Sequence, residues 1–178
     1  MSRARLMLSV QRAVGIEMSI CLTLNRFCYS TKLKELFALM SWLGDGKAWY
    51  FLIASLPLFY GSRGFHTSLH MVEVGILNIL LYKLIKSLAG RSRPCALDNN
   101  ILLGAAPLDQ YSFPSGHTMH AVAFSTVAVA YHPELAWLLV PFASLIALSR
   151  IVLGLHFPSD VFVGAVIGGL TATFIPGA

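Results

Sequence analysis

The sequence predicts an all-α fold, a polytopic helix bundle embedded in a membrane. Hydrophobic residues occupy 56% of the 178 positions and charged residues 12%, whereas a soluble domain carries about 25% charged residues. The mean hydropathy is +0.69, so a single water-soluble core could not cover the apolar residues. The net charge of +5 is scattered between apolar runs, which argues against nucleic-acid binding. The length fits one domain covering 1–178.

About six apolar spans are expected, because a bilayer core of about 30 Å takes roughly 20 helical residues. They are predicted at 11–29, 48–61, 65–88, 116–131, 135–155 and 158–175. The first span is weak, since it is interrupted by Arg12, Glu17 and Asn25. Five spans with an interfacial N-terminal segment are therefore the alternative. An amphipathic interfacial helix is expected over 33–43, ended by a turn at 44–46.

Six spans would put both termini on one side of the membrane. The positive-inside rule assigns that side to the cytoplasm, because it would carry Arg3, Arg5, Arg12 and Arg63. The bias is slight, since the other side would carry Lys32, Lys34 and Lys47.

Four polar helix ends are predicted to meet on the face opposite the termini. In chain order they carry Lys86 and Arg93, then Ser115 and His117, then Arg150 and His156, then Asp160. The three cations suit a phosphoryl group, whose oxygens spread more negative charge than one carboxylate. Pro114 suits the first turn of a helix. The N–H groups of that helix start form an anion site. Ser115 adds a hydroxyl donor, and Gly116, which has no side chain, lets an anion approach the backbone closely.

Two histidines and an aspartate complete this set. His156 lies four residues before Asp160, and Pro158 between them is expected to begin the last helix. A carboxylate there can accept a hydrogen bond from one ring nitrogen of His156, which makes the other nitrogen a better nucleophile. His117 is then the candidate general acid and base.

These residues resemble the three-part signature of the type 2 phosphatidic acid phosphatase (PAP2) superfamily, which reads K-x6-RP, PSGH and SR-x5-H-x3-D. The parts stand in order at 86–94, 114–117 and 149–160, and three correctly spaced parts are far more specific than one. The resemblance implies a membrane lipid phosphatase that needs no metal or cofactor and forms a phosphohistidine. It implies that His156 is the nucleophile, that Asp160 supports it and that His117 protonates the leaving group. The phosphate-binding residues that it implies are Lys86, Arg93, Ser115, Gly116 and Arg150.

The resemblance leaves the lipid open. The family covers phosphatidic acid, phosphatidylglycerol phosphate, undecaprenyl pyrophosphate and lipid A phosphates. The loop 95–113 is the expected selector, with polar candidates Asp98, Asn99, Asn100, Asp109 and Gln110. The compact form points to a bacterial cytoplasmic (inner) membrane with the site on its extracytoplasmic face. The oligomeric state is not readable from the sequence.

Several other functions were weighed against this one. Transfer of the phosphoryl group to another lipid is a variant of the same chemistry. A phospholipid transporter or an inactive scaffold would not need a histidine with its own carboxylate. A metal held by His117, His120 and His156, with Asp160 nearby, is disfavoured, because the three cations would repel it. The three cysteines form no CxxC pair, which argues against a disulfide framework and a zinc site. Soluble haloperoxidases of the same family do not match this hydrophobicity.

Three further features have local interpretations. Glu17 and Glu73 interrupt apolar runs, and interfacial positions or helix contacts are expected for both. His120 is expected to be a packing or supporting residue. The glycines at 164, 168 and 169 predict close helix packing.

Overall fold

A computed structural model describes residues 3–107 and 109–174, and this part of the chain contains helices and loops without any strand. The predicted all-α class is therefore confirmed. The α-helices are α1 (Arg3–Asn25), α2 (Thr31–Trp42), α3 (Ala48–Ala89), α4 (Pro94–Leu97), α5 (Gly116–Tyr131), α6 (Ala136–Val152) and α7 (Pro158–Phe174). Short helical turns lie between them: η1 (Arg26–Tyr29), η2 (Leu43–Lys47) and η3 (Pro133–Leu135).

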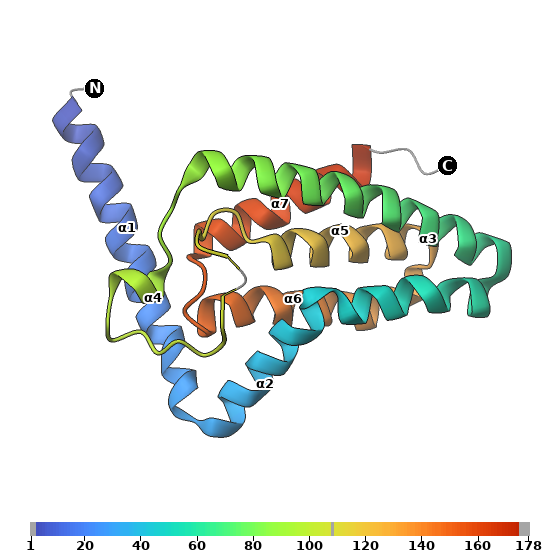
Figure 1. The fold of residues 1–178 in the computed structure, drawn as a ribbon, viewed down its shortest axis with the longest axis horizontal. Helices are drawn as coiled ribbons and strands as arrows, with labels where there is room; N and C mark the ends of the chain where they lie inside the picture. The colour runs from blue at the N-terminus through green and yellow to red at the C-terminus, as the bar shows by residue number, and fades with distance from the viewer. Residues whose placement is uncertain (1–2, 108, 175–178) are drawn as a thin grey trace.

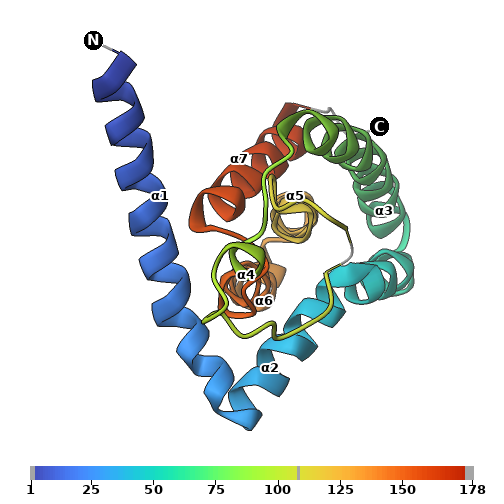
Figure 2. The same cartoon turned by 60° about the vertical axis from the view of Figure 1, so that its left-hand side comes forward.

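The bundle consists of α3, α5, α6 and α7 running side by side (Figure 1). α5 lies in the middle, in contact with the other three (Figure 2). Small side chains allow this central position, since Ala121, Ala123 and Ala128 are fully buried beside Trp49 and Phe124. By length and composition, the stretches Thr31–Leu97 and Pro133–Val152 could cross a membrane, and α7 is a shorter apolar helix.

α3 is a helical hairpin whose two arms, 48–60 and 62–89, are separated by a break at Gly61. Gly61 has φ 57° and ψ −134°, a conformation open to glycine and strained for other residues. The chain reverses there, and the arms run antiparallel (Figure 1). They pack so closely that a Cβ on Gly64 would lie 2.1 Å from the carbonyl oxygen of Leu56. The arms correspond to the spans expected at 48–61 and 65–88.

The start of α7 packs directly against the start of α5. A Cβ on Gly164 would lie 2.6 Å from the carbonyl oxygen of Ser115, and one on Gly168 would lie 2.2 Å from that of Met119. Close packing is thus confirmed at these two glycines, whereas Gly169 has its nearest atom at 3.9 Å. The approach brings two signature parts together.

α1 crosses one end of the bundle instead of running along it (Figures 1 and 2). Its C-terminal residue, Asn25, donates hydrogen bonds to the carbonyls of Leu102 and Val152 at 2.9 and 2.8 Å. α1 therefore does not run parallel to the helices of the bundle (Figures 1 and 2). The membrane face on which Arg12 and Arg63 lie stays a prediction. The side chains of Arg3 and Arg5 are outside the described residues.

Candidate active site

The residues of the three signature parts lie together at the end of the bundle that α1 crosses. Lys86 is in the last turn of α3, and Arg93 precedes α4. The start of α5 carries Ser115, Gly116 and His117. Arg150 lies near the end of α6, His156 in the following loop and Asp160 in the first turn of α7. The structure thus brings all the candidate residues to one region, and their chemical roles stay predictions.

His156 is buried, with 2% of its surface exposed. Its Nε2 lies 3.3 Å from Arg93 Nη1, and its Nδ1 lies 3.7 Å from Asp160 Oδ2. The predicted hydrogen bond from the ring to Asp160 was wrong, because this distance is too long and His156 Nδ1 has no hydrogen-bond partner among the described residues. Asp160 Oδ2 accepts the backbone N–H of Phe157 at 2.8 Å. Burial above all, and the positive charges of Arg150 and Arg93, lower the pKa of His156 to about 3. The ring is therefore neutral and one nitrogen carries a lone pair.

Asp160 is held by a chain of ion pairs that reaches α1. Arg91 Nη1 donates to Asp160 Oδ1 at 2.6 Å, and Arg91 Nη2 donates to Glu17 Oε2 at 2.6 Å. Glu17 Oε1 also accepts the backbone N–H of Ser159 at 2.9 Å. The helix contact expected for Glu17 is thus confirmed. One arginine joins α1, the α3–α4 connection and the start of α7.

Lys86 and Arg93 both bind the carboxylate of Asp109. Lys86 Nζ donates to Oδ2 at 2.6 Å, and Arg93 Nη2 donates to Oδ1 at 2.8 Å. The Tyr82 hydroxyl also donates to Oδ2. Burial alone would raise the pKa of Asp109, but the hydrogen bonds from Lys86 and Tyr82 and the nearby charges lower it. The carboxylate is therefore ionised at neutral pH.

Arg150 is the third cation of the region. It is 2% exposed, and its Nη1 donates to the Ser41 hydroxyl of α2. Its Nε has no hydrogen-bond partner among the described residues. A buried donor without a partner is costly, so this N–H is suited to an oxygen of a bound anion.

The start of α5 is close to the prediction, with one correction. The helix begins at Gly116 with Ser115 as its N-cap, so Pro114 precedes the helix instead of occupying its first turn. The Ser115 hydroxyl lies 3.0 Å from that of Thr118. A Cβ on Gly116 would lie 2.7 Å from the ring of Tyr82, so a larger residue there would require the ring to shift.

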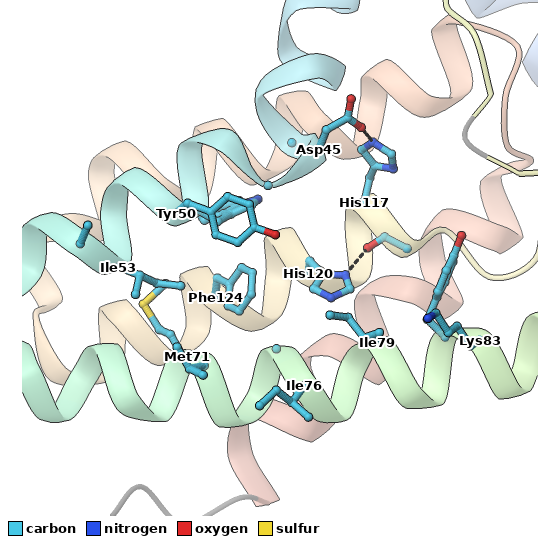
Figure 3. Close-up of a pocket in the computed structure, with 18 residues that line it drawn as sticks. Asp45, Tyr50, Ile53, Met71, Ile76, Ile79, Lys83, His117, His120 and Phe124 are labelled. Atoms are coloured by element: carbon cyan, nitrogen blue, oxygen red, sulfur yellow. Dashed lines mark hydrogen bonds and ion pairs between the residues drawn. The ribbon is translucent and has the colours of Figure 1, made fainter.

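His117 is paired with Asp45, which the sequence placed in a turn without assigning it a role. His117 Nε2 and Asp45 Oδ1 form a hydrogen bond from α5 to η2 (Figure 3). Burial would raise the pKa of Asp45, but this hydrogen bond and the positive charges around it lower the pKa. An ionised Asp45 can hold the ring and stabilise its protonated form. His120 Nδ1 bonds to the Gly116 carbonyl at 2.9 Å, in line with a packing role.

A groove of about 480 Å³ leads from His117 along the bundle. It lies between the two arms of α3 and α5, with His117 and Asp45 at one end and apolar side chains beyond (Figure 3). Trp49, Ile53 and Ile76 are among the residues that line it. The groove joins a polar site to apolar surface, as a lipid with a charged head group would require.

Three residues of this region had no assigned role in the sequence prediction, and Glu17 had only an expected helix contact or interfacial position. Ser41 and Asp45 hold two candidate side chains from α2 and η2. Arg91 lies inside the unspecified positions of the first signature part, and Glu17 lies far from the signature in the chain. The available signals were the charge of Glu17 inside an apolar run and the position of Arg91 between Lys86 and Arg93.

Comparisons with known proteins agree with the three signature parts. The PAP2 superfamily model matches residues 67–177. A lipid A 1-phosphatase from Rhizobium etli is 28% identical over 156 residues, which cover 76% of this chain and 67% of that relative. The first curated relatives are matched over 63–67% of their own length.

Solved structures share the fold as well. The first transmembrane PAP2 type phosphatidylglycerolphosphate phosphatase from Bacillus subtilis has a TM-score of 0.69 and 26% identity, over 92% of this chain and 83% of that one. Aquifex aeolicus LpxE has a TM-score of 0.64 and 32% identity, over 80% and 84%. The family match covers more than half of the chain and contains every signature residue, so this protein belongs to the PAP2 superfamily.

Proposed function

We propose that this protein is a membrane lipid phosphatase that removes a terminal phosphate through a phosphohistidine, without a metal ion. The observation that carries the proposal is the buried, neutral His156, whose Nε2 lies 3.3 Å from Arg93 in a region shared with Lys86 and Arg150. Phosphoryl transfer depends mainly on positioning and on stabilisation of charge. Fixed cations can supply both, and they would repel a metal ion.

The first chemical step forms a bond between His156 Nε2 and phosphorus and breaks the bond to the leaving oxygen. Asp160, 3.7 Å from Nδ1, stabilises the positive charge that develops on the ring. His117, held by Asp45, gives its proton to the leaving oxygen. In the second step His117 takes a proton from water, the hydroxyl attacks phosphorus, and the phosphorus–nitrogen bond breaks to release phosphate.

The groove supports a lipid as substrate. It begins at His117 and continues between apolar side chains of α3 and α5 (Figure 3), so an acyl or prenyl chain fits there while the phosphate reaches the cations. The similar proteins are described as a lipid A 1-phosphatase and a phosphatidylglycerolphosphate phosphatase. Both descriptions fit a lipid phosphomonoester or pyrophosphate as the substrate class.

Five membrane spans fit the arrangement best: the two arms of α3, then α5, α6 and α7. In this proposal α1 lies on the membrane surface beside the site, and the whole chain acts as one domain. Arg63 at the far end fits the cytoplasmic side, which puts the site on the extracytoplasmic face of a bacterial inner membrane.

The test is phosphate release by purified protein in detergent with EDTA present. The substrates are phosphatidic acid, phosphatidylglycerol phosphate, undecaprenyl pyrophosphate and a lipid A phosphate. His156→Ala is expected to lose activity, and His66→Ala, an exposed histidine of α3, is the matched control. Loss of release on adding EDTA would overturn the metal-independent mechanism. A folded protein that releases phosphate from none of the four would favour transport, and transfer to an added lipid alcohol would identify a phosphoryl transferase.

A further inference from the structure

The anion-binding cations of this site already hold an anion, the carboxylate of Asp109. Its Oδ2 accepts from Lys86 Nζ at 2.6 Å and its Oδ1 from Arg93 Nη2 at 2.8 Å. Arg93 Nε also donates to the Asp109 backbone carbonyl at 3.2 Å. A carboxylate bridging two cations in this way occupies donors that would otherwise bind two oxygens of a phosphoryl group.

The burial of the two cations makes this contact a direct competition. The side chains of Lys86 and Arg93 are only 8% and 5% exposed, whereas that of Asp109 is 29% exposed. A phosphate that binds through these same buried donors must therefore displace Asp109. The pKa of Asp109 is lowered, so protonation does not remove this competitor at neutral pH.

We infer that Asp109 selects substrates by charge, admitting terminal phosphates and excluding phosphodiesters. This inference rests on the proposed phosphatase function. A phosphodiester lipid carries a single negative charge, the same as the carboxylate that it must replace, and gains little by the exchange. A terminal phosphate carries about −1.5 to −2 at neutral pH, so it attracts the cations more strongly than Asp109 does. Bulk phospholipids would otherwise occupy the site of an enzyme embedded among them.

The test compares inhibition by an anionic phosphodiester lipid in the wild type and in Asp109→Asn. Phosphate release from a lipid phosphomonoester is measured in mixed micelles with increasing phosphatidylglycerol. Asp109→Asn keeps the shape and one acceptor oxygen but removes the charge, so we expect inhibition at a mole fraction about tenfold lower than in the wild type. Inorganic phosphate is also expected to inhibit it more strongly.

Two further variants make the result specific. Glu35→Gln removes an exposed carboxylate of α2 that makes no ion pair with Lys86 or Arg93, so it should behave as the wild type. Tyr82→Phe leaves Asp109 charged but removes one of its donors, so it should shift inhibition in the same direction by a smaller factor. If Asp109→Asn does not fold, inhibition of Tyr82→Phe is measured in its place.

Equal inhibition of the wild type and of folded Asp109→Asn would overturn the inference. So would weaker inhibition of that variant by phosphate, because Asp109 would then support anion binding instead of opposing it. If Asp109→Asn does not fold, inhibition of Tyr82→Phe indistinguishable from the wild type would overturn it as well. Failure of the proposed function itself would appear differently, as absence of turnover in the wild type and in Glu35→Gln.

Discussion

Replacing Arg91 by methionine tests whether the ion pairs behind Asp160 contribute to the reaction. In the described part of the chain, Asp160 Oδ1 accepts a side-chain hydrogen bond only from Arg91, at 2.6 Å. Asp160 is fully buried and faces His156 Nδ1, where positive charge develops during attack on phosphorus. Arg91 is therefore a positioning residue that holds the carboxylate in place without touching the cation cluster.

The expected size of the effect follows from this one contact. A hydrogen bond to a charged group contributes about 1.5–3 kcal/mol. The Arg91 side chain is 26% exposed, so water can partly replace it, and the lower part of that range applies. A loss of about 1.5–2 kcal/mol corresponds to a kcat about 10- to 30-fold lower. KM should change little, because Arg91 bonds to Glu17, Ser159 and Asp160 and not to the phosphate-binding residues.

The assay is steady-state phosphate release, with unfolding measured in the same detergent. Arg91→Lys keeps the charge and should recover part of kcat. Glu17→Gln keeps the oxygen that accepts from Ser159 and removes only the outer ion pair, so a decrease of about two- to threefold is expected. An unchanged kcat in folded Arg91→Met, or a rise in KM alone, would refute the idea that Arg91 acts through Asp160.

Three other predictions follow from particular contacts. Gly168→Ala should lower the free energy of unfolding by about 1–3 kcal/mol, because its Cβ would lie 2.2 Å from the carbonyl oxygen of Met119. Gly169→Ala should be neutral or stabilising by up to about 1 kcal/mol, because the nearest atom to its Cβ would be 3.9 Å away. Denaturant unfolding of the two variants measures the difference. The pKa of His156 is lowered to about 3 in the folded protein, whereas an unfolded histidine has a pKa of about 6.5. Between these pH values only the unfolded chain is protonated at this residue, so the free energy of unfolding should fall as the pH drops below about 6.5. His156→Gln should flatten that slope in thermal unfolding at several pH values, and an identical slope would contradict the assignment. Ile76→Trp should fill the groove and raise KM several-fold for a long-chain lipid phosphate, with no change for a short water-soluble phosphate ester.

The sequence predicted those elements whose local chemistry decides their structure. The range 116–131 matches α5, because Pro114 before it and Pro133 after it bound the apolar run, although Pro114 itself lies outside the helix. The glycine spacing in α7 predicted its close packing for the same local reason. The course of α1 could not be predicted in this way, since an apolar run interrupted by charge fits either a span or a surface helix. One contact that holds α1 is the ion pair between Glu17 and Arg91, which lie 74 positions apart in the sequence.

In the candidate site, too, some residues could be predicted from local sequence and others could not. The signature residues each carry a chemistry that suits a phosphoryl group, so their type and spacing were sufficient to propose them. Asp45 and Arg91 are not among the fixed positions of the signature. They hold His117 and Asp160, and nothing in their residue type distinguishes that task from an ordinary surface charge. Only the fold shows which carboxylate faces which ring.

Asp109 shows a different limit of reasoning from sequence. Its place in the loop before the second signature part made it a candidate for selecting the lipid head group, which would imply contact with the substrate. The structure instead places its carboxylate on Lys86 and Arg93, the groups that are predicted to bind the substrate phosphate. A residue can therefore determine selectivity by occupying the binding site before the ligand arrives. Such a role follows from the competition between two anions for the same buried donors, and it appears only when both partners of the contact are known.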